Sequence, residues 1–129
     1  DNRVEEITDE EYENLELYEI PTNGLRSANI DQKVTLGRLE YESYTFTMKS
    51  LYGKDHDGFT IKTSEMYSKA GVNYTVIIEE NGDTIYESRF SKGVNLKMNA
   101  NRGSSYRVTI NNRSSELLSY KINIRSYAR

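Results

Sequence analysis

From residue 33 onward, apolar and polar side chains alternate along the chain with a period of two residues. This alternation predicts β-strands with one buried and one wetted face, because successive side chains of a strand point to opposite sides. About eight such strands follow one another, with apolar positions within residues 34–36, 44–48, 59–63, 74–78, around 85, 94–98, 106–110 and 120–124.

The segments between these strands favour turns rather than helices. The Asn81-Gly82 pair predicts a tight hairpin, since both residues accept a positive φ, so residues 72–80 and 83–90 are expected to be antiparallel neighbours. Strands at such short intervals, without helices between them, predict an all-β fold. We expect an antiparallel β-sandwich of jelly-roll-like form.

The first residues predict a short N-terminal helix that begins after Thr8. Thr8 and Glu11 have the spacing of a capping box, in which each side chain accepts a hydrogen bond from the other residue's backbone N–H. Pro21 ends this segment. We therefore divide the chain into an acidic N-terminal helix and linker, residues 1–30, and a β-sandwich domain, residues 31–129.

The net charge of −3 is unevenly distributed along the chain. Residues 1–19 contain nine acidic residues and one basic residue, which leaves a net charge of +5 on the remaining 110 residues. Two interpretations are open: the acidic segment lies across the basic surface of the body or keeps the protein soluble, or it forms a cation site or an arm that docks a partner. The basic residues are spread over many strands, so we expect no nucleic-acid partner.

The residue types that common catalytic centres require are scarce. Cysteine is absent, which excludes disulfides, zinc–thiolate sites and thiol nucleophiles. His56 is the only histidine, and the aspartates on either side of it point away from it in an extended chain. We therefore expect no catalytic residues and no enzymatic activity. No apolar run reaches the roughly 18 residues of a membrane-spanning helix, so we also expect no membrane insertion.

Tyrosine is abundant, with 11 copies, and falls into two groups. Tyr44, Tyr74, Tyr106 and Tyr120 occupy apolar positions of predicted strands and are expected in or beside the core. The second group lies off these faces or in connections, where tyrosines either cover strand edges or bind sugars and extended peptides through a flat ring and a polar hydroxyl. Its candidate ligand-binding members are Tyr41, Tyr52, Tyr67 and Tyr86.

Two glutamates form the one acidic pair that we single out in the predicted sandwich. Glu40 and Glu42 share a side of a strand start, because residues i and i+2 of a strand face the same way. Their oxygens suit a hard cation if backbone carbonyls and the acidic segment complete the coordination. The alternative is an exposed strand edge whose like charges are separated by solvent.

Several short motifs are spread over roughly residues 18–126: Tyr18-Glu19-Ile20-Pro21-Thr22-Asn23, Ala28-Asn29-Ile30, Gly37-Arg38-Leu39-Glu40-Tyr41-Glu42, Ser43-Tyr44-Thr45-Phe46, Asn101-Arg102-Gly103-Ser104-Ser105-Tyr106-Arg107-Val108 and Ser119-Tyr120-Lys121-Ile122-Asn123-Ile124. Together they resemble motifs of bacterial pre-peptidase C-terminal domains, which are similar to the collagen-binding domains of clostridial collagenases. The resemblance implies a jelly-roll sandwich of a secreted bacterial protein, often an adjunct to a protease. Some members bind calcium between the N-terminal linker and the sandwich, and the matching positions here are Glu19, Asn23, Glu40 and Glu42, although the two family aspartates are glutamates in this chain.

These observations predict a non-catalytic secreted or cell-surface binding module that recognises an extracellular polymer or protein. The alternative is a calcium-stabilised accessory or structural domain of a secreted bacterial system, with calcium as the only cofactor considered. The chain begins with Asp1 rather than Met, so we expect a signal peptide to have been removed. The sequence predicts neither the identity of the ligand nor the oligomeric state.

Overall fold

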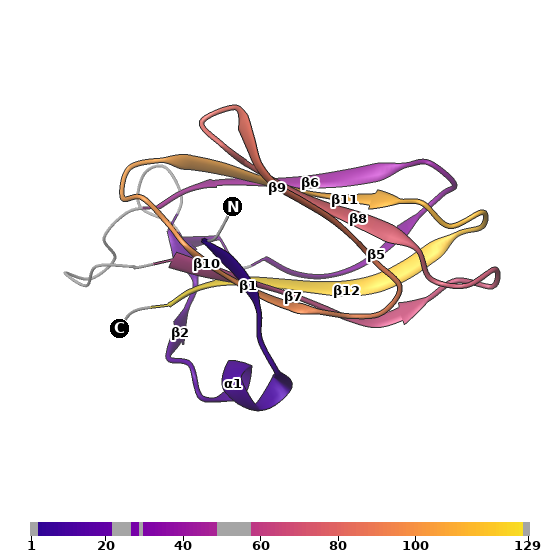
Figure 1. The fold of residues 1–129 in the computed structure, drawn as a ribbon, viewed down its shortest axis with the longest axis horizontal. Coiled ribbons are helices and arrows are strands. Elements are labelled where there is room, and N and C mark those ends of the chain that lie inside the picture. The colour runs from indigo at the N-terminus through magenta and orange to yellow at the C-terminus, as the bar shows by residue number, and fades with distance from the viewer. Residues whose placement is uncertain (1–2, 22–26, 29, 49–57, 128–129) are drawn as a thin grey trace.

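The computed structural model describes residues 3–21, 27–28, 30–48 and 58–127, and its two antiparallel sheets pack face to face (Figure 1). The principal strands are β5 (Ile30–Leu36), β6 (Tyr41–Thr47), β7 (Gly58–Tyr67), β8 (Tyr74–Glu80), β9 (Asp83–Phe90), β10 (Asn95–Asn99), β11 (Ser105–Asn112) and β12 (Leu118–Tyr127). One sheet pairs them in the order β5-β12-β7-β10 and the other in the order β6-β11-β8-β9. This winding is that of a jelly roll. The prediction of an all-β, jelly-roll-like sandwich of about eight strands is therefore confirmed.

Shorter strands come from the N-terminal part of the chain. β1 (Val4–Glu6) pairs with β10, and β2 (Leu17–Tyr18) pairs with the end of β12, which brings the first sheet to six strands. β3 (Ile20–Pro21) and β4 (Ser27–Ala28) form a separate two-stranded sheet. The N-terminal segment thus contributes strands to the sandwich as well as a helix.

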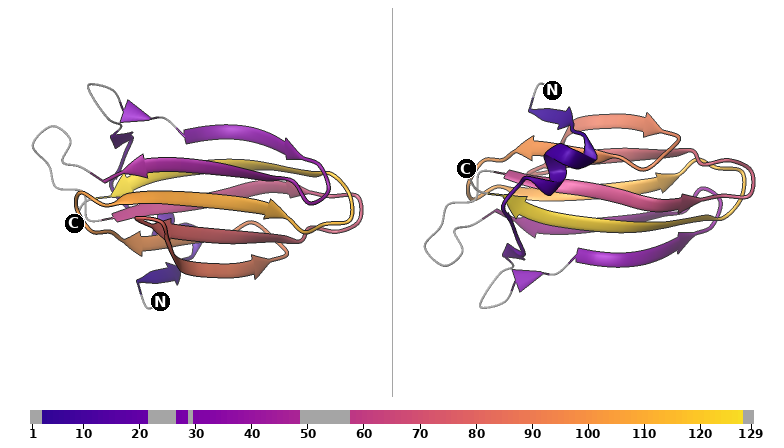
Figure 2. Two further views of the ribbon diagram at one scale, coloured as in Figure 1. Left: turned by 90° about the horizontal axis from the view of Figure 1, so that it is seen from above. Right: turned by 90° about the horizontal axis from the view of Figure 1, so that it is seen from below.

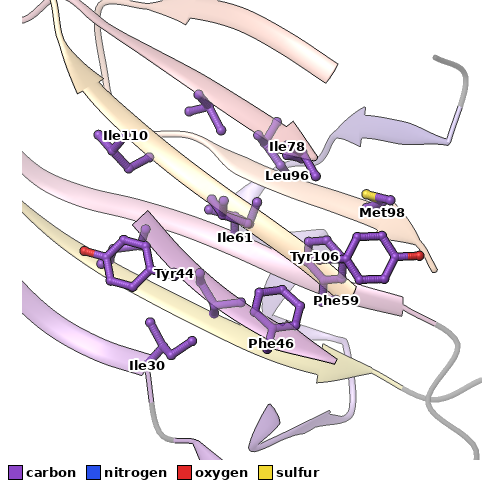
Figure 3. Packing of buried hydrophobic residues seen from close by; sticks show 14 of the residues in the cluster. Ile30, Tyr44, Phe46, Phe59, Ile61, Ile78, Leu96, Met98, Tyr106 and Ile110 are labelled. Carbon is purple, nitrogen blue, oxygen red and sulfur yellow. The ribbon is translucent and has the colours of Figure 1, made fainter. Parts of the chain in front are cut away.

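The core lies between the two sheets and is built from the inward-facing side chains of the alternating pattern (Figure 3). The rings of Phe46 and Phe59, from opposite sheets, meet edge to face with centroids 4.9 Å apart, and Tyr106 lies 5.1 Å from Phe59. Such aromatic pairs add to the stabilisation from burial itself, which is roughly 1.5–3 kcal/mol for each fully buried large side chain. The tyrosines predicted in the core are all buried: Tyr44, Tyr74, Tyr106 and Tyr120.

The predicted N-terminal helix is confirmed as α1 (Asp9–Glu13), together with both hydrogen bonds of its capping box. α1 lies across the outer face of the six-stranded sheet (Figure 2). Its Tyr12 is buried there, with the Lys62 ammonium 4.7 Å above the ring, and Asp9 is paired with Lys62 at 3.2 Å. Asp9, and also Glu5 at 4.0 Å from Lys97, therefore lie against lysines of the body, in agreement with the first of the two interpretations. Among the described residues, no helix has the length and apolar character needed to cross a membrane.

The long strands bring their connections to defined ends of the sandwich. The predicted hairpin joins β8 and β9, with positive φ angles of 49° at Asn81 and 90° at Gly82. The β5–β6, β7–β8 and β11–β12 connections gather at one end, whereas β1 and the last residues of β12 lie at the other (Figure 2).

Candidate ligand-binding surface

The residues predicted for a calcium site are placed at different ends of the sandwich. Glu19 follows β2, which pairs with the end of β12 at Ser126, whereas Glu40 follows β5, which pairs with the start of β12 at Leu118. The eight residues of strand between these two pairings correspond to roughly 26 Å. One cation cannot contact both groups across that length.

The remaining candidates add no cluster within the described residues. Asn23 lies outside them. The Glu40 carboxylate accepts a hydrogen bond from the backbone N–H of Gly37 within its own turn, and Glu42 is exposed at the start of β6. No group of three or more histidine, cysteine or acidic side chains able to hold a metal occurs in the described part of the chain.

The candidate tyrosines differ in their exposure. Tyr41, at the start of β6, is 66% exposed, and Tyr67, at the end of β7, is 65% exposed. Tyr86 of β9 is half-buried and packs against the core, and this burial raises the pKa of its hydroxyl. Tyr52 and His56 lie outside the described residues. Among the candidates that the structure describes, Tyr41 and Tyr67 are thus the two that are mostly exposed.

Both exposed tyrosines lie at the same end of the sandwich as two exposed leucines, and we call these four residues the apolar end. Within the described residues, the large hydrophobic side chains that are mostly exposed all lie near the β5–β6, β7–β8 and β11–β12 connections: Leu39, Tyr41, Tyr67 and Leu117. Scattered single hydrophobic residues are ordinary on protein surfaces, but their collection at one end of a domain is typical of an interaction site. The alternation of residue types does not reveal Leu39 or Leu117, because both lie in connections.

Leu39 is exposed in a turn that does not suit it. The Glu40 N–H donates to the Gly37 carbonyl at 3.1 Å, which closes a four-residue turn, and Leu39 occupies its third position with a φ of 62°. Glycine or asparagine is favoured there, because a Cβ atom is crowded in the left-handed region. The turn therefore keeps a bulky apolar side chain in solvent in spite of both a backbone and a hydration cost.

The side chain of Asn112 joins two connections of the apolar end. It is fully buried, and its amide donates to the carbonyls of Leu36, Gly37 and Glu116 at 3.3, 2.9 and 3.0 Å. Its carbonyl oxygen accepts from the Ser114 N–H at 2.8 Å. Asn112 thereby fixes the β5–β6 turn, which carries Leu39, against the β11–β12 connection, which carries Leu117. No sequence pattern indicates this role, because Asn111-Asn112 resembles an ordinary turn pair.

A β-bulge in β7 determines the orientation of Tyr67. Ser119 of β12 pairs with Tyr67, but Lys121, two residues later, pairs with Ser64, so β7 contains one extra residue, and Glu65 has a φ of 51°. Uninterrupted alternation from Ile61 and Thr63 would direct residue 67 into the core. Because of the bulge, Met66 packs against the core instead and Tyr67 points to solvent.

The opposite end of the sandwich holds a polar network that attaches the N-terminal segment. The Arg3 guanidinium donates to both carboxylate oxygens of Glu80, at 2.6 and 3.1 Å, and the Tyr106 hydroxyl and the Asn101 amide also donate to Glu80. The hydrogen bonds from Arg3, followed by those from Tyr106 and Asn101, lower the pKa of Glu80 to about 2. The charges of Arg3 and Glu80 neutralise each other, and the network forms a structural clamp between the two sheets.

No protein-family model matches the chain, and no curated protein matches it. The resemblance to pre-peptidase C-terminal domains therefore stays a prediction that rests on short motifs. The fold agrees with the jelly-roll sandwich that this resemblance implies, but a jelly roll carries many unrelated functions. The feature of this chain that bears on function is accordingly the apolar end itself.

Proposed function

We propose that this chain is a non-catalytic binding module, secreted or at the cell surface, that recognises an extracellular polymer or protein. The observation that carries the proposal is the apolar end, where Leu39, Tyr41, Tyr67 and Leu117 are 60–66% exposed. Removal of exposed tyrosine and leucine side chains from water by a partner favours binding. The tyrosine hydroxyl can in addition form a hydrogen bond that orients the partner. Connections on a rigid sandwich are a common location for such contacts.

The geometry of the apolar end supports a role in binding for its exposed hydrophobic residues. Leu39 and the bulge beside Tyr67 both use left-handed backbone conformations that cost of order 1 kcal/mol or more. Asn112 holds the connections in place through hydrogen bonds. A surface that is ordered before binding loses less conformational entropy when a ligand arrives.

The proposal is tested by retention of the protein on immobilised extracellular materials, among them collagen, chitin and bacterial cell-wall preparations. The double variant Leu39→Ser/Tyr41→Ser removes two apolar contacts of the apolar end, and we expect it to lose retention on the material that holds the wild type. Ile77→Ser is the matched control, because Ile77 is a half-buried residue on the outer face of the four-stranded sheet, within β8. Equal retention of both variants and the wild type would contradict the proposal, as would a wild type that no material retains.

The calcium-stabilised alternative receives no support from the positions of Glu19 and Glu40 at opposite ends of β12. A thermal melt separates the two functions. The binding module is expected to melt at the same temperature in millimolar calcium and in chelator, whereas a structural calcium site would raise the melting temperature with calcium concentration.

A further inference from the structure

A surface depression of about 270 Å³ lies on the outer face of the six-stranded sheet, next to Tyr67. It crosses the three strands β5, β12 and β7, and its polar lining comes from Lys33, Thr35, Glu65, Ser119 and Lys121. These residues form two rows across the strands. Thr35, Ser119 and Tyr67 are direct neighbours in one row, and Lys33, Lys121 and Ser64 are neighbours in the next.

The two lysines of the depression are placed directly opposite each other. Lys33 of β5 is the cross-strand partner of Lys121 of β12, an arrangement in which like charges repel. Asp31 lies 3.8 Å from the Lys121 ammonium, while no carboxylate partner of Lys33 is found within the described residues. An anionic group between the two ammonium groups would relieve the repulsion and satisfy Lys33.

The carboxylate of the depression lies on its far side. Glu65 belongs to β7 and Lys33 to β5, so the whole of β12 separates them, a distance of two strand spacings or roughly 9.6 Å. The bulge directs Glu65 outward, where its carboxylate can accept hydrogen bonds from ligand hydroxyls. The depression therefore carries lysine ammonium groups on the β5 side and a hydrogen-bond acceptor, the Glu65 carboxylate, on the β7 side.

The remaining groups suit a sugar better than a peptide. Tyr67 offers a flat ring beside the hydroxyls of Ser119 and Thr35, which lie 3.4 Å apart. An aromatic face packs against the C–H face of a pyranose, and side-chain hydroxyls match its O–H groups. An extended peptide usually adds to a free sheet edge, whereas these groups lie on the face of three paired strands.

From this juxtaposition we infer that the depression is a subsite for an acidic polysaccharide. A uronate carboxylate lies between Lys33 and Lys121, and the sugar ring packs on Tyr67. This inference rests on the proposed function, because it names the class of polymer that the binding module recognises. It also explains why the bulge turns Tyr67 toward solvent beside the lysine pair.

Isothermal titration calorimetry at low salt tests the inference with three uronate polymers as probes: polygalacturonate, alginate and hyaluronan. We expect one of them to bind, and the double variant Lys33→Gln/Lys121→Gln to bind it at least about tenfold more weakly, since two charge-assisted contacts are lost. Tyr67→Ala is expected to weaken binding by about fivefold or more, and Tyr67→Phe to retain it. Lys92→Gln, at an exposed lysine outside the depression, is the matched control and should bind as the wild type does.

Neutral and peptidic probes separate recognition of a uronate from binding of any sugar or of any polyanion. Fully methyl-esterified polygalacturonate keeps the sugar backbone without the charge, and equal affinity for both forms would overturn the role of the lysines. Poly-L-glutamate bound as tightly as the uronate polymer would overturn the assignment to a sugar. If no uronate polymer binds while another material is retained through Leu39 and Tyr41, the inference fails and the proposed function stands. If no material of either panel is retained, both fail together.

Discussion

Replacement of Glu80 by glutamine tests how firmly the N-terminal segment is attached to the sandwich. Glu80 ends β8, and Arg3 precedes β1, so their contact joins the two sheets through side chains that are distant in sequence. The substitution keeps the size of the side chain but removes its charge. The partly buried guanidinium of Arg3 then loses the carboxylate to which it donates two hydrogen bonds.

The pKa of Glu80 determines how much free energy of unfolding Glu80→Gln is expected to lose. Hydrogen bonds from Arg3 are the largest cause that lowers this pKa from 4.5 to about 2. At 1.36 kcal/mol for each pH unit, the difference corresponds to an upper limit of about 3 kcal/mol. The side chains of Glu80 and Arg3 are 15% and 29% exposed, so solvent screening reduces the expected loss to about 2 kcal/mol.

The pH dependence follows from the direction of the shift. Because the folded-state pKa is lowered, the stabilisation is complete above the unfolded-state pKa of about 4.5 and is lost as the pH falls towards about 2. We expect the free energies of unfolding of the wild type and Glu80→Gln to differ by about 2 kcal/mol at pH 7 and to converge near pH 2. Urea unfolding followed by circular dichroism between these pH values measures the difference, since the chain has no tryptophan for fluorescence.

Glu79→Gln is the matched control for this experiment. Glu79 precedes Glu80 and points to the opposite face of β8, so its substitution removes a carboxylate without breaking the pair with Arg3. It should change the free energy of unfolding by no more than about 0.5 kcal/mol. A Glu80→Gln effect that is independent of pH, or no larger than that of Glu79→Gln, would refute the electrostatic explanation.

Three further substitutions test other parts of the structure. Ile122→Asp places a charge at a fully buried core position, so we expect no cooperative unfolding transition at 25 °C by circular dichroism, and an unchanged melting temperature would contradict the assigned inward face. Asn112→Ala leaves the carbonyls of Leu36, Gly37 and Glu116 without their shared donor, which should lower the urea unfolding free energy by about 2–4 kcal/mol. Leu39→Asn relieves the strain of the left-handed backbone, so it should raise the free energy of unfolding by about 0.5–1 kcal/mol and reduce retention on the ligand. An increase in both the free energy of unfolding and the retention would argue against a contact between Leu39 and the ligand.

The sandwich could be predicted from the sequence because its strands obey one local rule. Most principal strands alternate over much of their length, and inward positions such as Tyr44, Ile78 and Ile124 are buried. The capping box at Thr8 and the Asn81-Gly82 hairpin were also predictable, since both depend on residues close in sequence. The pairing of β1 with β10 was not, because three residues far from their partner carry no alternation that can be recognised.

Only part of the candidate surface could be predicted from the sequence, because the rest depends on contacts between segments that are distant in sequence. Tyr41 and Tyr67 attract attention as tyrosines away from apolar positions, but the burial of Tyr86 depends on contacts between distant strands. Likewise, the grouping of Leu39 with Leu117 requires Asn112 to hold two connections that are more than 70 residues apart in sequence. The facing lysines appear only when the register between β5 and β12 is known.

The positions where local rules fail are themselves informative. Leu39 and Glu65 both have left-handed backbones that favour glycine, and both lie on the half of the sandwich that carries the apolar end. Such a backbone conformation costs a bulky or charged residue of order 1 kcal/mol, and a single substitution to glycine or asparagine would remove this strain. The retention of a strained residue therefore needs a compensating advantage. For Glu65, one advantage is structural, since the bulge turns a carboxylate out of the core. That reason does not apply to Leu39, whose turn would be better served by asparagine and whose side chain gains nothing from exposure in the isolated chain. Contact with a ligand supplies the missing advantage, which makes Leu39 the residue whose substitution most directly separates stability from binding.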